Sequence, residues 1–319
     1  MKVLFNCLQS GLANNGGSRT LLFCQKTIRE LGHKCDIAAA NDRFTWFDHP
    51  KPVRKLNGDY DVIVATACTT VAKTLYASNI RKKAWYIRGH EIWVPNYDEN
   101  TLIEMYCNKN IVKITNSRWI QKFIERLNVE CHLVPQGIDT ELWYNTGART
   151  YTGKIIIGCL YSKKPSKGWD HFKVLSDLLG HKYYSYIAYG SKDIDNPKFL
   201  DTYFSNPSIE ALRDIYSSCH YWFSPTELEG LHNPTMEAAL CGAKIVCSNH
   251  PRNGITTEYA NKYNAFVYDD SNVSLAADLI KNDTVEDTRK VDIMKTDILN
   301  KIGNRKDCVR KLIKVLGTI

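Results

Sequence analysis

The sequence has no apolar run long enough to cross a membrane. Its longest apolar stretches fall far short of the roughly 20 residues that a spanning helix needs. The chain starts with a mostly apolar run, but this run stops at Asn6, so a buried first strand explains it better than a signal peptide does. Because no targeting segment is visible, we expect a cytoplasmic protein.

The 11 cysteines include no CxxC pair, the spacing that is typical of zinc sites and of thioredoxin-like redox sites. Their number is odd, and they are scattered along the whole chain. Three of them, Cys7, Cys159 and Cys247, fall in apolar strand-like runs, where a free thiol behaves as a small hydrophobic side chain. We therefore expect free thiols in a reducing compartment.

The chain also lacks a basic run interleaved with aromatic residues, so we expect no nucleic-acid partner. Its formal charge of +8 is uneven, because residues 1–150 carry 20 Lys and Arg against 14 Asp and Glu, whereas residues 151–319 carry 22 against 20. The basic first half could attract an anionic acceptor, or hold the protein at the inner face of an anionic membrane as a peripheral protein. Ordinary surface solubility explains the excess equally well.

Short apolar runs alternate with helix-like segments, a pattern that is typical of βα units around a parallel sheet. The expected strands are residues 2–7, 35–39, 61–65, 84–87, 111–115 and 132–134, followed by 154–159, 183–189, 221–223 and 244–247. The expected helices are residues 18–31, 118–127, 169–179, 208–217 and 234–240, with a further helix starting at residues 69–70 and a mostly helical tail after residue 274.

The pattern is interrupted by a polar, Gly-containing segment without periodicity at residues 145–153, which we interpret as a linker. The sequence therefore predicts an α/β protein with two Rossmann-like domains, residues 1–148 and 149–303, whose parallel sheets face each other across a cleft. Ligands of open parallel sheets bind beyond the carboxyl ends of the strands. This fold alone does not determine a function.

The most informative stretch is SPTELEGLHNPTMEAALCGA, residues 224–243. It follows an apolar strand, and Gly230 permits a tight turn. Asn233 is a good N-cap and Pro234 suits the first helical position, so a helix should begin there. A helix N-terminus at the end of a parallel strand offers free N–H groups and a positive dipole end, which suits a diphosphate.

Two carboxylates, Glu229 and Glu237, flank this helix start with the spacing E-x7-E. They would repel a phosphate, but they could accept hydrogen bonds from sugar and ribose hydroxyls, and charge-assisted bonds of this kind are strong. The simpler interpretation is that Glu237 favours the helix N-terminus and that Glu229 is a solvated loop charge. The spacing alone does not decide between the two interpretations.

Residues 224–242 resemble the PSxxEGFGLxxxEAMAxG signature of retaining glycosyltransferases of the GT-B fold, specifically the family-4 group, also called glycosyl transferases group 1. The residues in register are Ser224, Pro225, Glu229, Gly230, Glu237, Ala238 and Gly242. One departure is plain: His232 stands where the family usually has its second glycine.

Two other stretches resemble the family in order along the chain. NNGGSR, with Gly16 and Gly17, resembles the Gly-rich turn after the first strand, and IGCLYSKKPSKG resembles the phosphate-binding strand and loop, with Lys167 matching the family lysine. The family arginine a few residues earlier is missing, and Lys163 is the candidate to replace it. The resemblance implies that the donor is bound by Gly16, Gly17, Lys163, Gly230, Asn233, Thr235 and Glu237.

The resemblance also implies a catalytic set of His90, Glu229 and Lys167. His90 falls where the family commonly has a histidine near the donor sugar, although a histidine flanked by aromatic residues is equally often a packed one. Glu229 would orient the sugar, and the Lys167 ammonium would neutralise the leaving diphosphate. Arg88 and Glu91 are further candidates for contacts with the acceptor.

The activity that the resemblance implies is transfer of a hexosyl-type sugar, with retention of configuration, from a nucleoside-diphosphate sugar to a glycan, lipid-linked or other hydroxyl acceptor. No cofactor and no metal are implied. In this family the last helix usually crosses back to the first domain, a role that residues 304–319 would take.

Three alternatives stay open. A dinucleotide-dependent oxidoreductase would share the βα pattern, but it should show G-x-G-x-x-G directly after a strand, which the NNGGSR turn lacks. A non-catalytic protein that binds a nucleotide sugar or glycan is favoured by His232 and by the missing arginine. A sugar-nucleotide epimerase or a phosphorylase could use the same architecture, and product analysis would separate them.

Overall fold

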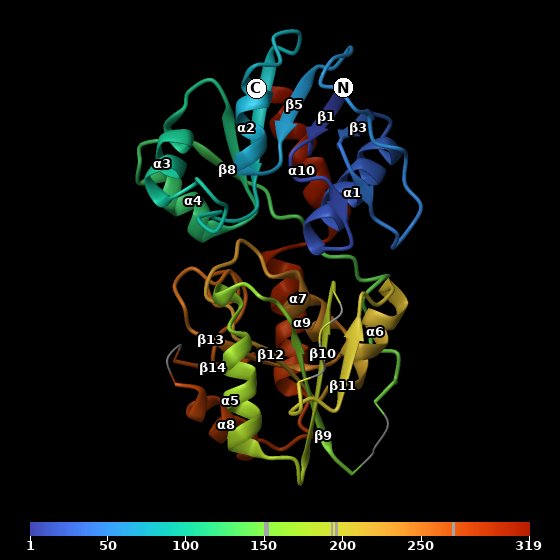
Figure 1. The fold of residues 1–319 in the computed structure, drawn as a ribbon, viewed down its shortest axis with the longest axis vertical. Helices are drawn as coiled ribbons and strands as arrows, with labels where there is room; N and C mark the ends of the chain where they lie inside the picture. Colours follow the sequence, from blue (N-terminus) through green and yellow to red (C-terminus); the bar gives the residue numbers. More distant parts are fainter. Residues whose placement is uncertain (150–152, 193, 195–196, 270–271) are drawn as a thin grey trace. The chain divides into compact units, whose positions relative to one another are not determined.

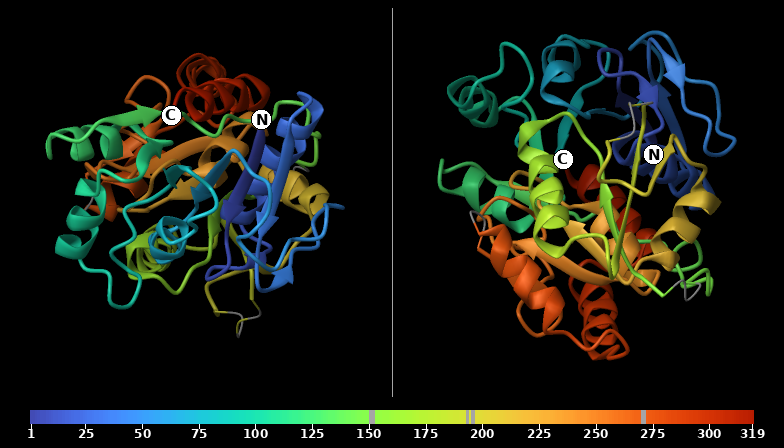
Figure 2. Two further views of the ribbon diagram at one scale, coloured as in Figure 1. Left: turned by 90° about the horizontal axis from the view of Figure 1, so that it is seen from above. Right: turned by 60° about the horizontal axis from the view of Figure 1, so that its bottom comes forward.

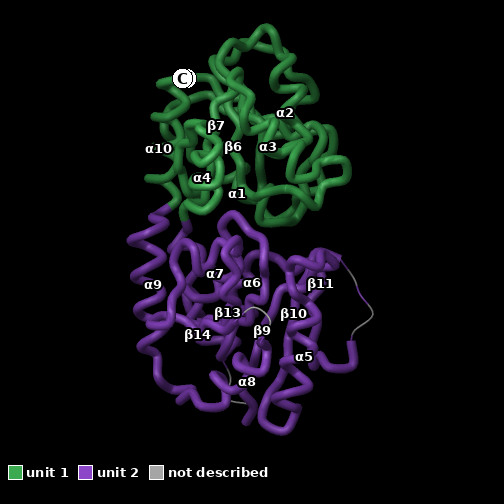
Figure 3. The backbone as a smooth tube through the Cα atoms, turned by 90° about the vertical axis from the view of Figure 1, so that its left-hand side faces the viewer, with its two compact units in different colours: residues 1–137, 305–319 green, residues 138–304 purple. Residues whose placement is uncertain are grey.

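The computed structural model describes residues 1–149, 153–192, 194, 197–269 and 272–319. These residues form two compact units, which are drawn in different colours in Figure 3. Unit 1 consists of Met1–Gly137 together with Arg305–Ile319, and unit 2 consists of Ile138–Asn304. Of the linker expected at residues 145–153, residues 150–152 lie outside the described part of the chain.

Unit 1 is built on a six-stranded parallel sheet (Figure 1). Its strand order is β3 (Lys34–Ala38), β1 (Lys2–Asn6), β5 (Val62–Ala65), β6 (Lys82–Ile87), β7 (Val112–Thr115) and β8 (Cys131–Leu133). The helices are α1 (Gly16–Glu30), α2 (Cys68–Leu75), α3 (Glu99–Cys107), α4 (Arg118–Glu125) and α10 (Arg305–Thr318). A small separate pair joins β2 (Leu12–Ala13) to β4 (Asp42–Arg43).

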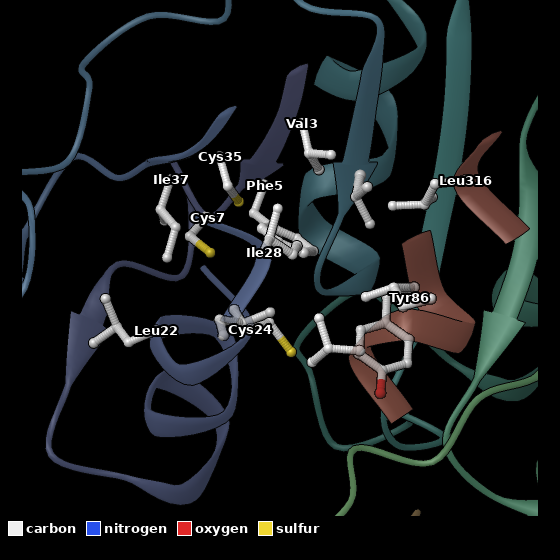
Figure 4. Packing of buried hydrophobic residues seen from close by; sticks show 14 of the residues in the cluster. Val3, Phe5, Cys7, Leu22, Cys24, Ile28, Cys35, Ile37, Tyr86 and Leu316 are labelled. Carbon is white, nitrogen blue, oxygen red and sulfur yellow. The ribbon is translucent and has the colours of Figure 1, made fainter. Parts of the chain in front are cut away.

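The core of unit 1 lies between the sheet and the paired helices α1 and α10. Val3 and Phe5 of β1 and Tyr86 of β6 pack there against Ile28 of α1 and Leu316 of α10 (Figure 4). Alternate strand residues point to opposite faces of a sheet. The opposite face is therefore available to α2 and α3, and Trp85 of β6 stacks there on Tyr106 of α3.

The cysteines take part in this packing as thiols. All 11 lie in the described residues, none of them forms a disulfide, and Cys107 is the exposed one among them. Burial raises the pKa of the Cys24 thiol to about 11, against a small opposing effect of Arg305 and Arg88. This thiol is therefore neutral near pH 7 and packs as an apolar group.

Unit 2 repeats the arrangement with a second parallel sheet of six strands. Its order is β11 (Thr202–Ser205), β10 (Tyr184–Gly190), β9 (Ile155–Leu160), β12 (Tyr221–Ser224), β13 (Lys244–Ser248) and β14 (Phe266–Tyr268). The helices are α5 (Trp169–Leu179), α6 (Ile209–Ser218), α7 (Asn233–Leu240), α8 (Val273–Lys281) and α9 (Arg289–Lys301), with a short 3-10 turn at Pro165–Lys167.

The helices of unit 2 cover both faces of its sheet. Helices α5 and α8 lie side by side on one face (Figures 1 and 2), where Phe172, Phe223 and Tyr268 form an aromatic stack. Trp222 points to the other face and meets Tyr216 of α6. Gly158 of β9 makes room for this indole, since a Cβ at that position would lie 2.6 Å from the Trp222 ring.

The two parallel, Rossmann-like sheets confirm the fold class expected from the sequence. Among the elements of the two main sheets and their helices, α3, β11 and β14 were not anticipated. Helix α1 begins at Gly16, two residues before the expected start, because Asn15 caps it by accepting a hydrogen bond from the Ser18 N–H at 2.8 Å. In the described part of the chain, no helix is both long enough and apolar enough to cross a membrane.

Candidate functional site

The turn between β12 and α7 carries most of the residues that the sequence singled out. Strand β12 is fully buried, and the chain leaves it at Pro225 and enters α7 at Asn233. The N-cap is His232, one residue earlier than the sequence suggested, with Asn233 and Pro234 in the first helical turn. The first N–H groups of α7 therefore lie at the carboxyl end of the sheet, the edge at which parallel sheets bind ligands.

A second loop packs directly against this turn and delivers Lys167. The Glu227 N–H donates to the Ser166 carbonyl at 2.9 Å, and the Thr226 hydroxyl donates to the same oxygen at 3.1 Å. Gly168 has φ 65°, and a Cβ there would lie 2.9 Å from Pro225 Cβ and closer still to the Pro225 carbonyl oxygen. Only glycine fits this position without displacing one of the loops.

This packing places the Lys167 ammonium in contact with the Glu229 carboxylate. The two side chains are only 20% and 15% exposed. Burial, and secondarily the neighbouring charge of Lys164, lowers the pKa of Lys167 to about 7. The ammonium is therefore poorly hydrated, and near pH 7 it is only partly protonated. A bound anion would raise the pKa of Lys167 and keep the group charged.

Glu229 is also held by its own turn and by the loop after β13. Its Oε1 accepts a hydrogen bond from the Thr226 hydroxyl at 3.3 Å, and its backbone N–H donates to the Arg252 carbonyl at 2.9 Å. Gly254 presses against the same turn, since a Cβ there would lie 2.7 Å from the Gly230 carbonyl carbon. The position of the carboxylate is thus fixed by loops from three parts of unit 2.

His232 fills the space that a second glycine would leave empty. Its Nδ1 lies 2.6 Å from the Thr235 hydroxyl, which in turn lies 2.6 Å from the Ser224 hydroxyl. Burial, and secondarily the charge of Lys167, holds the pKa of His232 well below its usual range, so the imidazole is neutral. Its Nε2 is 3.9 Å from Glu229 Oε1, which is too far for a hydrogen bond.

Glu237 belongs to a separate hydrogen-bonded group within unit 2. It lies in α7 and is 3% exposed, and its Oε2 accepts a hydrogen bond from the Tyr216 hydroxyl at 3.1 Å. Tyr216 pairs with the Tyr189 hydroxyl at 2.6 Å. The sequence suggested Glu237 by its spacing from Glu229, but it gave no signal for the two tyrosines, which come from α6 and β10.

Lys163 lies on the exposed part of the loop after β9. It lines a cavity of about 460 Å³ together with Tyr161, Gly168, Trp169 and Glu227. The structure thus brings Lys167, Glu229 and Thr235 into one cluster with His232, places Gly230 and Asn233 on the same turn, and keeps Lys163 on the neighbouring loop. Among the described residues, no group of three His, Cys, Asp or Glu side chains is placed to hold a metal ion.

In unit 1, Gly16 and Gly17 form the first turn of α1, at the carboxyl end of β1. Arg88 fixes this turn from the end of β6, donating from Nη1 to the Gly17 carbonyl at 2.7 Å and from Nη2 to the Thr66 carbonyl at 3.0 Å. A Cβ at Gly17 would lie 3.2 Å from Arg88 Nη1. Arg88 therefore has a structural role, whereas the sequence suggested it only as a contact with the acceptor.

His90 lies just beyond β6 and is 1% exposed. Its Nδ1 is 3.2 Å from the Tyr106 hydroxyl, its Nε2 is 3.6 Å from Glu99 Oε1, and the rings of Trp119 and Phe123 enclose it. These neighbours come from α3 and α4. Direct contact between this imidazole and a sugar would require one of these side chains to move, and its catalytic role stays a prediction.

Glu91 follows His90 and anchors the loop to α2. Its Oε2 accepts a hydrogen bond from the Cys68 N–H at 2.5 Å, at the first residue of that helix. A carboxylate at a helix N-terminus is favoured by the free N–H groups and by the dipole. Burial raises the pKa of the Cys68 thiol, and the charge of Glu91 raises it further.

Comparison with known proteins gives matches by structure alone. No protein-family model matches the sequence, and no curated protein matches it. HepE of Anabaena, solved in complex with UDP-glucose, superposes with a TM-score of 0.78 at 14% identity over 100% of both chains. Sucrose-phosphate synthase of Thermosynechococcus elongatus gives 0.78 at 12% identity over 100% of this chain and 98% of that one.

A glycosyltransferase of Rickettsia africae gives a TM-score of 0.73 at 14% identity over 99% of this chain and 98% of that one. These structures share the GT-B architecture, and the superpositions extend over both units and essentially the whole chain. At identities this low, the shared property is the fold. The chain therefore has the GT-B fold, with two Rossmann-like units.

Proposed function

We propose that the protein is a glycosyltransferase that takes its sugar from a nucleoside-diphosphate donor bound by unit 2. The observation that carries this proposal is the contact between Lys167 and Glu229 beside the N-terminus of α7. The ammonium and the helix N–H groups suit a diphosphate, whereas the carboxylate suits sugar hydroxyls. The solved complexes of HepE with UDP and UDP-glucose, and of an alpha-glucosyltransferase with UDP, make UDP the first nucleotide to test.

In this proposal each residue of the cluster binds a different part of the donor. Lys167 and the N–H groups of Asn233 and Thr235 receive the diphosphate, with Lys163 on the loop beside them. Glu229 orients the sugar and Glu237 accepts from the ribose diol, a carboxylate that Tyr216 already holds in place. Gly230 lets the backbone of this turn approach the donor closely.

The chemistry follows from the charges that these residues present. Departure of the diphosphate is assisted by Lys167 and by the α7 N-terminus, which take the part that a metal ion would otherwise play. The acceptor hydroxyl then attacks the same face of the sugar and gives its proton to the leaving phosphate, so that the anomeric configuration is retained. Membership of the family-4 group, a hexosyl donor and a cytoplasmic location belong to the same proposal.

A thermal-shift panel with UDP, GDP, ADP, CDP and dTDP tests the donor site. A diphosphate at about 100 times its dissociation constant should stabilise the protein by about 2.7 kcal/mol. We expect one nucleotide to raise the melting temperature of the wild type but not that of Glu237→Ala. The control variant is Glu286→Ala, which removes an exposed carboxylate near the amino end of β13 and should respond like the wild type. A panel without any shift would contradict the proposal.

The second candidate is a non-catalytic protein that binds a nucleotide sugar or a glycan. It is favoured by His232, whose ring occupies the place of a family glycine beside Glu229. The two candidates differ in turnover, because a transferase releases nucleoside diphosphate when donor and acceptor are both present. Binding of the donor without any release, across a panel of hydroxyl acceptors, would select the binding protein.

A further inference from the structure

The loop that follows β6 in unit 1 carries an aromatic surface that the donor site does not use. Trp93 is 37% exposed although it is one of the largest apolar side chains in the protein. The loop and the first turn of α3 line an open depression of about 380 Å³. Its aromatic lining comes from Trp93 and Tyr97, and its polar lining from Asn96, Asp98 and Thr101.

This depression lies at the edge of the sheet where ligands bind. All six strands of the main sheet of unit 1 are parallel, so the loop after β6 lies at their carboxyl ends, as does the turn that begins α1. A Cβ at Gly89 would lie 3.1 Å from Trp93 Cη2, which places the indole against the backbone between Arg88 and His90. The aromatic surface therefore lies next to Arg88 and His90, the residues that the sequence suggested for contact with the acceptor and for catalysis.

The loop is ordered by its own hydrogen bonds. The Val94 N–H donates to the Glu91 carbonyl at 3.0 Å, and the Tyr97 N–H donates to the Val94 carbonyl at 3.0 Å. The Glu91 carboxylate ties the loop to Cys68 at the start of α2. A surface that is held in this way loses little conformational entropy when a ligand binds.

The charge of the loop selects the class of ligand. Residues 91–104 include Glu91, Asp98, Glu99 and Glu104 but no Lys or Arg, although the first half of the chain is basic as a whole. An acidic loop repels an anionic membrane surface and a phosphorylated acceptor. Carboxylate, amide and hydroxyl oxygens beside an exposed indole suit a neutral sugar, whose hydroxyls donate hydrogen bonds and whose C–H face packs on the ring.

We propose that this depression binds a neutral pyranose ring of the acceptor, packed on the indole of Trp93. The inference rests on the proposed function, because the occupant is the sugar that receives the transferred residue. It also argues against the anionic acceptor that the excess of basic residues suggested, since those residues lie outside this loop.

The test uses fluorine NMR of the full-length protein labelled with 5-fluorotryptophan. The chain has seven Trp residues, and the resonance that is lost in Trp93→Phe is that of Trp93. Methyl α- and β-pyranosides of glucose, galactose and mannose are titrated in the presence of UDP. We expect at least one to shift the Trp93 resonance saturably. We also expect Trp93→Ala to weaken its binding by up to about tenfold, measured on the proton resonances of the glycoside itself.

Two controls test whether the effect belongs to the depression beside Trp93. Tyr76→Ala, which removes another exposed aromatic ring of unit 1, should leave the affinity for the glycoside unchanged. Vesicles containing phosphatidylserine should not move the Trp93 resonance. If no glycoside moves that resonance, or if the vesicles do, the inference is overturned.

The outcome also separates this inference from the proposed donor site. UDP stabilisation is measured on the same labelled protein. Stabilisation by UDP without a glycoside effect overturns the subsite and leaves the donor proposal standing. A glycoside effect without any UDP binding leaves a sugar site at Trp93 but overturns its role as an acceptor site.

Discussion

Removal of the Lys167 ammonium tests the pairing with Glu229 through protein stability. The substitution Lys167→Met keeps much of the apolar length of the side chain and removes the charge. At pH 6, where Lys167 with its pKa of about 7 is charged, the wild-type pair is intact. The variant leaves Glu229 with a carboxylate that is 15% exposed and has lost its contact with the cation.

The size of the effect follows from that exposure. Breaking a buried ion pair by removing one partner costs about 3–5 kcal/mol, because the remaining charge is uncompensated. Glu229 is partly hydrated and keeps its hydrogen bond from Thr226 at 3.3 Å, so we expect a smaller loss of about 2–3 kcal/mol. For a unit of this size, the loss corresponds to a fall in melting temperature of about 4–12 °C.

The double variant Lys167→Met/Glu229→Gln supplies the matched control. It removes both charges, so it should be more stable than Lys167→Met alone by at least about 1 kcal/mol, a coupling typical of residues in contact. Calorimetric unfolding of wild type, the two single variants and the double variant at pH 6 measures this coupling. Wild-type melting of Lys167→Met, or simple additivity in the double variant, would refute the reasoning.

Three further predictions concern the same unit. Gly168→Ala places a Cβ 2.9 Å from Pro225 Cβ and should lower the free energy of unfolding by about 2–4 kcal/mol. Gly147→Ala, where φ is 75° and no atom lies within 4 Å of the added Cβ, should lower it by only about 1–2 kcal/mol. Equal losses in thermal unfolding would contradict the steric argument. Because the pKa of Lys167 is about 7, the UDP dissociation constant should rise by up to about tenfold per pH unit above pH 7, and titration calorimetry should show proton uptake at pH 8. The variant Lys167→Arg, whose side chain is always charged, should lose this pH dependence. If that variant keeps the wild-type pH profile, the assignment is rejected. Tyr216→Phe removes a hydrogen bond to Glu237 at 3.1 Å and should weaken UDP binding by about 0.5–1.5 kcal/mol in calorimetry, while an unchanged affinity would separate Glu237 from the nucleotide.

The sequence predicted the parallel sheets because their central strands are fully buried, and such strands read as continuous apolar runs. Strand β5 and strand β12 are examples, and both were placed within a residue of their observed bounds. The edge strands β11 and β14 were missed. None of the four residues of β11 is buried, so this strand carries no apolar run, and β14 has only three residues, of which the middle one is not buried. Helix α3 was missed because it buries only Leu102 and Tyr106.

The members of the candidate site could be chosen from the sequence, but their partners could not. Glu229 and Lys167 were selected from two motifs far apart in the chain, and their contact depends on the close packing at Gly168. The side chains that enclose His90 come from α3 and α4, so the sequence around His90 does not predict that it is buried. The hydroxyl of Tyr216 also reaches Glu237 from another helix, so the sequence around Glu237 does not predict this hydrogen bond.

A crystal structure of the protein with UDP tests the central claim most directly. We predict that the diphosphate lies within hydrogen-bond distance of Lys167 Nζ and of the first N–H groups of α7, with the ribose hydroxyls on Glu237. UDP bound elsewhere, or a diphosphate that makes no contact with Lys167 or α7, would contradict the account.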